Sequence, residues 1–208
     1  MLEVKRLRAD HAAAVLAFEQ ENRAFFAAHV SDRGDRFFER FTDDFYALLA
    51  TQAAGTCAFH AVFADDGSVL GRFNLFDIAD GTANVGYRVA RRASGRGLAT
   101  QGVQELCQMA RARYGLQTLR AAVSTANVAS ARVLTKAGFV TVGPAGPAHL
   151  GGKLGTWYER ELLPPAPQVG RQAAGPRCHQ TSTPAPGPCA EPVVGIWRPQ
   201  VGHSRRLL

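Results

Sequence analysis

The residues best suited to chemistry lie in a glycine-rich stretch between a predicted strand and a predicted helix. Arg92, Gly95 and Gly97 follow the spacing Arg-x-x-Gly-x-Gly, and Arg96 lies between the glycines. A helix start presents unpaired N–H groups and the positive end of the helix dipole. Glycines there let a phosphate approach the backbone, and the arginines add positive charge. The stretch is typical of a pyrophosphate cradle, although a plain strand-to-helix turn has the same spacing.

A second motif begins about 30 residues downstream, at the next predicted strand-to-helix junction. Asn127 can cap a helix, which places Ser130 at its third residue, and Lys136 and Gly138 suit its end. Helix chemistry alone would also explain these residues. The first motif lacks the Gly-Lys-Ser/Thr of Walker loops. The antiparallel strands expected before it exclude a dinucleotide-binding fingerprint.

The two motifs together resemble the GNAT superfamily of N-acetyltransferases. Arg92, Gly95 and Gly97 match its Arg/Gln-x-x-Gly-x-Gly/Ala motif, and the second block is matched by Asn127, Ser130, Lys136, Gly138 and Phe139. The segment 86–89, Gly-Tyr-Arg-Val, is most similar to the branch that acetylates N-terminal alanine or serine of ribosomal proteins. The resemblance extends over residues 69–163, is looser over 1–68 and is absent from 164–208.

This resemblance implies a single α/β domain whose central sheet is mixed, mostly antiparallel and flanked by helices. Two central strands would splay apart, and the pantetheine arm of acetyl-CoA would lie between them like an extra strand. Asn127 would contact that arm. The cofactor-binding residues that the resemblance implies are Val89, Arg92, Ser94, Gly95, Arg96, Gly97, Leu98, Ala99 and Asn127.

The catalytic groups depart from the common family pattern. Many relatives carry a Glu where this chain has Asn84, and a Tyr proton donor where it has Leu134. The resemblance leaves Ser130 as the candidate donor to the thiolate, although a Ser at this helical position is often a local backbone partner. Asp77 and Asp80 lie in a predicted neighbouring loop, where an aspartate is more often a solvated surface residue than a catalytic base. A water molecule can serve as the base instead, so no residue is assigned to this role.

Periodicity predicts the elements that position these motifs. A short strand over 2–7 precedes helices over 11–26 and from 35, the second capped by Asp35 with an apolar face. Strands over 56–64, 69–76 and 82–90 form an antiparallel meander, broken at turn signals. The remaining elements are helices over 98–114 and from 127, and strands over 117–123, 140–142 and 154–162.

Composition limits the function classes. The 208 residues suit one domain, over 1–163, and a disordered tail over 164–208 with nine prolines and five glycines. The net charge of +7 is about +3 without this tail, too little for a nucleic-acid surface. The four cysteines fit no zinc pattern, so no metal is expected. With no signal peptide or long apolar run, a cytoplasmic protein without a membrane partner is expected.

We therefore expect an enzyme that acetylates a primary amine with acetyl-CoA, and the branch resemblance favours a protein or peptide N-terminus, including that of a ribosomal protein. Small amines such as antibiotics, polyamines or amino acids remain open, because the acceptor-binding part of the chain matches no branch. A non-catalytic acyl-CoA-binding module is the remaining alternative.

Overall fold

The computed structural model describes residues 2–28 and 30–162, and they form one sheet with helices on both faces. The strands are β1 (Lys5–Arg6), β2 (Ala58–Phe63), β3 (Val69–Ala79), β4 (Thr82–Val89), β5 (Thr118–Ser124), β6 (Val140–Ala145) and β7 (Gly155–Glu161), in the order β1-β2-β3-β4-β5-β7-β6. Only the β4–β5 pair is parallel. The predicted meander is β2–β3–β4, and the mixed, mostly antiparallel sheet is confirmed.

The N-terminal helices are more divided than the sequence suggests. They are α1 (Ala12–Glu21), α2 (Arg23–Ala27), α3 (Asp35–Glu39) and α4 (Phe41–Ala53). The expected single helix over 11–26 is wrong, because Asn22 ends α1. The Asn22 amide donates to the Phe18 carbonyl at 2.9 Å and accepts from the Arg91 N–H at 2.8 Å.

The second predicted helix is likewise divided, at Arg40. The expected cap is also wrong: Gly34 occupies the cap position, and the Asp35 carboxylate accepts from Arg23 at 2.7 Å instead. The expected apolar face does turn inward. Its residues Phe37, Phe41, Phe45 and Leu48 are buried, and Phe38 and Leu49 pack against that core.

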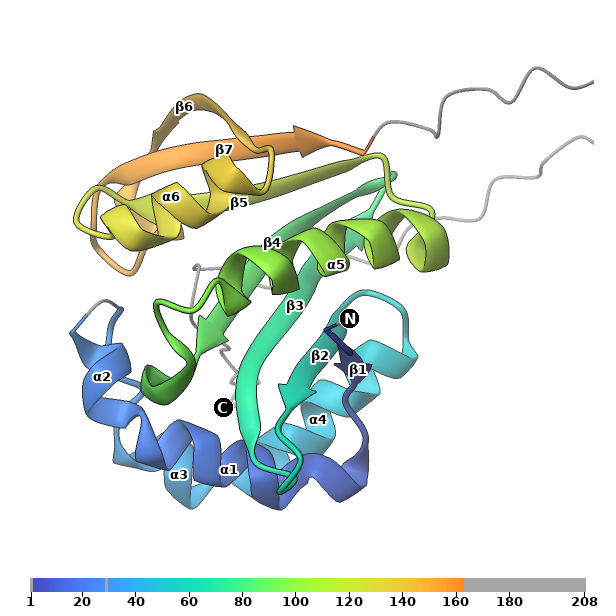
Figure 1. Ribbon diagram of the computed structural model, residues 1–208, viewed down its shortest axis with the longest axis vertical. Helices are drawn as coiled ribbons and strands as arrows, with labels where there is room; N and C mark the ends of the chain where they lie inside the picture. Colours follow the sequence, from blue (N-terminus) through green and yellow to red (C-terminus); the bar gives the residue numbers. More distant parts are fainter. Residues whose placement is uncertain (1, 29, 163–208) are drawn as a thin grey trace, which may run out of the picture.

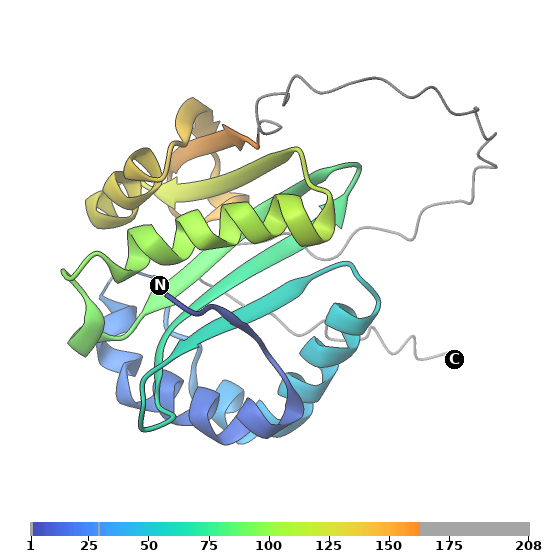
Figure 2. The same cartoon turned by 45° about the vertical axis from the view of Figure 1, so that its right-hand side comes forward.

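Neighbouring residues of β3 point to opposite faces of the sheet, as strand geometry requires. Arg72 reaches Glu19 of α1, whereas Phe73 packs so closely on Gly102 of α5 that a Cβ there would lie 2.1 Å from the ring. We call these the α1 face, with Arg72 and its partner Arg88, and the α5 face, with Phe73 and Tyr87. Figures 1 and 2 show α1–α4 along one side of the sheet and α5 along the other.

The sheet opens at its centre. β4 pairs with β3 as far as Val89, but it pairs with β5 only from Thr82 to Asn84. Beyond Asn84 the two parallel strands separate, with α5 (Leu98–Tyr114) and α6 (Val128–Lys136) following them in the chain (Figure 1). The predicted splay is confirmed, and the gap widens toward the glycine-rich stretch.

The glycines delimit the best-predicted element. The helix expected over 98–114 is found at those bounds because Gly97 (φ 81°) and Gly115 (φ 65°) both adopt the left-handed conformation at its ends. No helix within the described ranges is long and apolar enough to cross a membrane. The tail predicted over 164–208 lies outside the described residues.

Candidate active site

The glycine-rich stretch lies at the start of α5, at the open end of the splay. Gly95 (φ 77°) and Gly97 (φ 81°) hold the turn, and a Cβ on Gly95 would meet nothing within 4 Å. Among the described residues no side chain caps α5, so the first N–H groups, including those of Leu98 and Ala99, have no helical partner. Exposed backbone at the positive end of a helix dipole suits a pyrophosphate.

The side chains of this stretch leave the backbone accessible. Ser94 turns its hydroxyl away and donates to the Ala90 carbonyl at 3.0 Å, and Arg96 is exposed. Arg92 is also exposed, and its guanidinium contacts the Ser68 hydroxyl in the β2–β3 turn. The phosphate role of Arg92 therefore stays a prediction that requires this side chain to turn from Ser68.

The second motif lies at the β5–α6 junction. The Asn127 side chain accepts from the Ser130 N–H at 3.1 Å, so the predicted cap and the third-residue position of Ser130 are confirmed. Because the cap uses only the amide oxygen, the Asn127 NH₂ is still able to donate to a cofactor. Gly138 (φ 83°) follows the end of α6, also as predicted.

Ser130 is linked across the splay to β4. Its hydroxyl lies 2.8 Å from the Tyr87 hydroxyl, which also donates to the Ser130 carbonyl at 3.2 Å. Burial raises the pKa of Tyr87, against the hydrogen bond with Ser130, so Tyr87 stays a neutral phenol. Either hydroxyl can be the donor in the 2.8 Å bond, and the Ser130 proton is available to a third group when the phenol is the donor. The sequence did not predict this bond, which joins residues 43 positions apart.

The residues at the two departures from the family pattern have different surroundings. Leu134 is completely buried in the core. Asn84 lies on the α1 face at the last residue paired between β4 and β5, and its amide donates to Asp77 Oδ2 at 3.1 Å. Asp77, on β3, has the positive φ of 51° that few residues other than glycine adopt. The sequence predicted Asp77 and Asp80 only as members of a neighbouring loop.

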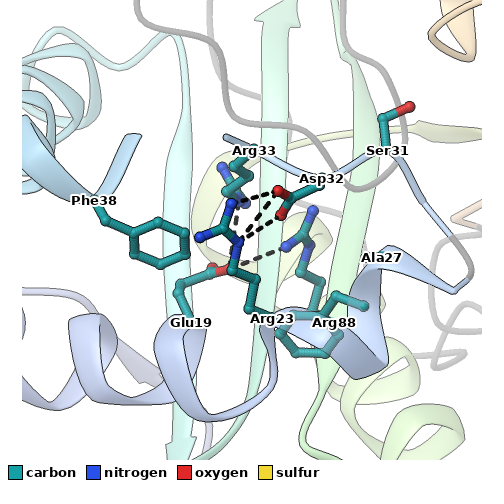
Figure 3. Close-up of a pocket in the computed structure, with 9 residues that line it drawn as sticks. Glu19, Arg23, Ala27, Ser31, Asp32, Arg33, Phe38 and Arg88 are labelled. Atoms are coloured by element: carbon teal, nitrogen blue, oxygen red, sulfur yellow. Dashed lines mark hydrogen bonds and ion pairs between the residues drawn. The ribbon is translucent and has the colours of Figure 1, made fainter. Parts of the chain in front are cut away.

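A buried charge cluster lies on the α1 face, and Figure 3 shows three of its members, Glu19, Arg33 and Arg88. The Glu19 carboxylate, 1% exposed, forms ion pairs with Arg72 at 2.7 Å, Arg88 at 3.0 Å and Arg33 at 3.3 Å. Each arginine side chain is at most 9% exposed. We call these four residues the Glu19 cluster, and its formal charge is +2.

The Glu19 cluster perturbs its own titration. Burial disfavours the charged carboxylate, but the three arginines together outweigh this cost and lower the pKa of Glu19 to about 2. Burial also lowers the pKa of Arg33 to about 9, against the attraction of Glu19. A cavity of about 10 Å³, roughly the space of one water, adjoins the cluster beside Arg23 and Asp32. Sequence reasoning missed the cluster because its members lie 14 to 69 residues apart.

The model of the acetyltransferase (GNAT) domain family matches residues 2–140. The chain is 29% identical over 170 residues to the probable N-acetyltransferase YjcK of Bacillus subtilis, which spans 77% of this chain and 91% of that protein.

Two solved structures share the fold. One is a ribosomal-protein-S5-alanine acetyltransferase from Vibrio fischeri (TM-score 0.70, 20% identity, 76% of this chain and 91% of that one). The other is a spermidine N-acetyltransferase from Vibrio cholerae in complex with CoA and spermine (TM-score 0.64, 14% identity, 77% and 95%).

Proposed function

Because this chain belongs to the GNAT family of acetyltransferases, and so uses acetyl-CoA as co-substrate to acetylate an amine, we propose that its acceptor is the N-terminal amine of a protein or peptide. The acceptor class is the open part of the function, since both ribosomal-protein and spermidine acetyltransferases share the fold. The charge of the α1 face supports the choice between them.

The observation that carries the proposal is that the carboxylates in and beside the Glu19 cluster are already ion-paired with arginines. A polyamine carries several positive charges and needs carboxylates that are not already neutralised. Glu19 is surrounded by three arginines, and both Asp32 and Asp35 are ion-paired with Arg23. We infer that a face on which Glu19, Asp32 and Asp35 are already ion-paired favours a peptide, which presents a single N-terminal charge, over a multiply charged polyamine.

The cofactor contacts follow the splay. We propose that the pantetheine arm extends β4 as an added strand near Val89 and that the backbone of 94–99 binds the pyrophosphate. Two features of the described residues support this placement: the β4 edge that faces β5 is unpaired beyond Asn84, and the start of α5 has no side-chain cap. The Asn127 NH₂ would contact the arm from the other side of the gap. Ser130 would then lie beside the departing thiolate and give it a proton, with Tyr87 fixing the direction of its hydroxyl.

The proposal is tested by release of free thiol from acetyl-CoA with a panel of acceptors. The panel contains peptides with N-terminal alanine and serine, their N-acetylated forms as controls, and spermidine. We expect the free peptides to support turnover and the blocked peptides to support none. Faster turnover with spermidine than with every peptide would overturn the acceptor assignment, and mass spectrometry of the products locates the acetyl group.

A further inference from the structure

The described residues contain a carboxylate at the splay that the proposed function leaves without a role. Asp77 and Asn84 join side chains on β3 and β4, where the pairing of β4 with β5 ends. Both residues are half-buried. If the thioester lies at the inner end of the gap, this pair lies beside it on the α1 face, whereas Tyr87, which bonds to Ser130, belongs to the α5 face.

The backbone at Asp77 is held in an uncommon conformation. Its φ of 51° coincides with a shift of the β3–β4 register between Phe76 and Ala79. A non-glycine residue with positive φ has an energetic cost, and such residues are concentrated at functional sites. The irregularity lets a β3 side chain meet the Asn84 amide across the strand pair, so the carboxylate is fixed by a donor from β4.

We propose that Asp77, positioned by Asn84, is the general base that accepts the proton of the acceptor ammonium. This inference rests on the proposed acetyl transfer. Many relatives carry a Glu at the position of Asn84. In this chain the carboxylate belongs to Asp77 on the neighbouring strand β3, and Asn84 on β4 orients it.

The proton inventory of the reaction balances. An α-amino group has a pKa of about 7.7–8.0, so most of the acceptor is ammonium at pH 7. Its first proton goes to Asp77 and then to water. The nitrogen lone pair forms the C–N bond to the acetyl carbon, and the C–S bond breaks with its electron pair on sulfur. The second proton lost by nitrogen balances the proton gained by the thiolate.

Several titratable groups lie on the elements around this pair. Arg120 on β5 is the register partner of Asn84, and it is ion-paired with Glu159 on β7 at 3.2 Å. Asp80, in the β3–β4 turn, also has a positive φ, 48°. The segment before β2 contributes the buried thiol of Cys57. Asp77→Asn keeps the size of the side chain and removes its negative charge, so this variant tests the charge itself.

The test compares Asp77→Asn with Asp80→Asn, since asparagine tolerates positive φ and each variant removes one charge from the same end of the β3–β4 hairpin. With the amine that the wild-type enzyme acetylates fastest, we expect Asp77→Asn to lower kcat/KM by about 100-fold at pH 7, and Asp80→Asn to change it less than threefold. The deficit of Asp77→Asn shrinks as the pH rises above the pKa of the amine, because the base is then no longer needed.

A second variant moves the carboxylate. Asp77→Asn combined with Asn84→Asp keeps a carboxyl–amide pair in the same place, and it should recover at least tenfold of the lost activity. A deficit below threefold for Asp77→Asn, or one of equal size at every pH, would overturn the inference and leave the acetyl transfer standing. If the wild-type protein binds acetyl-CoA but none of the amines tested causes release of free thiol, the proposed function is overturned, and the role of Asp77 with it.

Discussion

Two regions of the molecule differ in whether backbone or side chains form their accessible or packed surface. The proposed cofactor region, at Gly95, Gly97 and the splay, consists largely of accessible backbone: within the described residues no side chain caps α5, and β4 and β5 are unpaired beyond Asn84. The α1 face is crowded with aromatic rings and the Glu19 cluster. A site for a shared cofactor can be built from backbone, whereas a surface that distinguishes acceptors depends on particular side chains.

This contrast implies that single substitutions in the Glu19 cluster mainly affect stability, whereas those at the glycine-rich stretch mainly affect binding and rate. Replacing Glu19 by Gln leaves three buried arginines without their carboxylate. We expect it to lower the free energy of unfolding by about 3–5 kcal/mol, measured by urea denaturation at pH 7. Glu21→Gln, an exposed change on the same helix, is the control and should cost less than about 0.5 kcal/mol. Equal effects of the two would contradict the contrast.

The free energy of unfolding of the wild type and of Glu19→Gln should also depend differently on pH. The pKa of Glu19 is lower in the folded protein, about 2, than its ordinary value of 4.5, so its contribution is present above pH 4.5 and is lost as the pH falls toward 2. Burial also lowers the pKa of His60 to about 4, which adds a loss from pH 6.5 to 4. The Glu19→Gln variant should still lose stability between pH 6.5 and 4, because His60 is unchanged. It should not show the further loss of stability between pH 4.5 and 2 that Glu19 causes in the wild type.

The next effect concerns the glycine cradle. Gly97→Val places a β-branched side chain at φ 81° beside the predicted phosphates, and we expect acetyl-CoA affinity to fall by about 10²–10³-fold, or about 3–4 kcal/mol. Gly115→Val has a similar backbone cost at the other end of α5. Calorimetric titration should show near-normal affinity for that control. Unchanged affinity of a folded Gly97→Val protein would remove the cradle from the cofactor site.

Ser130→Ala tests whether the link across the splay takes part in the chemistry. We expect kcat to fall by about 100-fold with little change in the KM for acetyl-CoA, because the thiolate loses its proton donor. Val128→Ala, an exposed change on the first turn of α6, is the control. Full kcat in Ser130→Ala would assign thiolate protonation to solvent and leave Ser130 as a partner of Tyr87 alone.

The smallest effect is expected at the cap of α6. Asn127→Ala removes the bond to the Ser130 N–H and the proposed contact with the pantetheine arm. We expect a loss of about 1 kcal/mol in stability and a several-fold rise in the KM for acetyl-CoA. Asn127→Ser keeps a capping oxygen but no NH₂, so it should restore stability without restoring KM. Recovery of both would show that the cap alone matters.

The sequence predicted best where local chemistry determines structure. The bounds of α5 follow from Gly97 and Gly115, and the cap of α6 follows from Asn127, because these effects act within a few residues. The break at Asn22 was missed because its cause is a bond to Arg91, 69 positions away. The Glu19 cluster was missed for the same reason, because the packing of α1 on the sheet brings Glu19 to Arg72 and Arg88. The Asp77–Asn84 pair depends on a shift of the β3–β4 register, which no single-sequence pattern specifies.

The short β4–β5 pairing also bears on handling of the protein. Over the described residues, the strand edge of β4 from Val85 to Val89 has no partner on β5. Bare strand edges are templates for intermolecular pairing and aggregation. If the cofactor covers this edge, it acts as a protective ligand, and depletion of acetyl-CoA during purification should promote precipitation. Adding CoA to the buffer should then improve solubility even where no acetyl group is to be transferred.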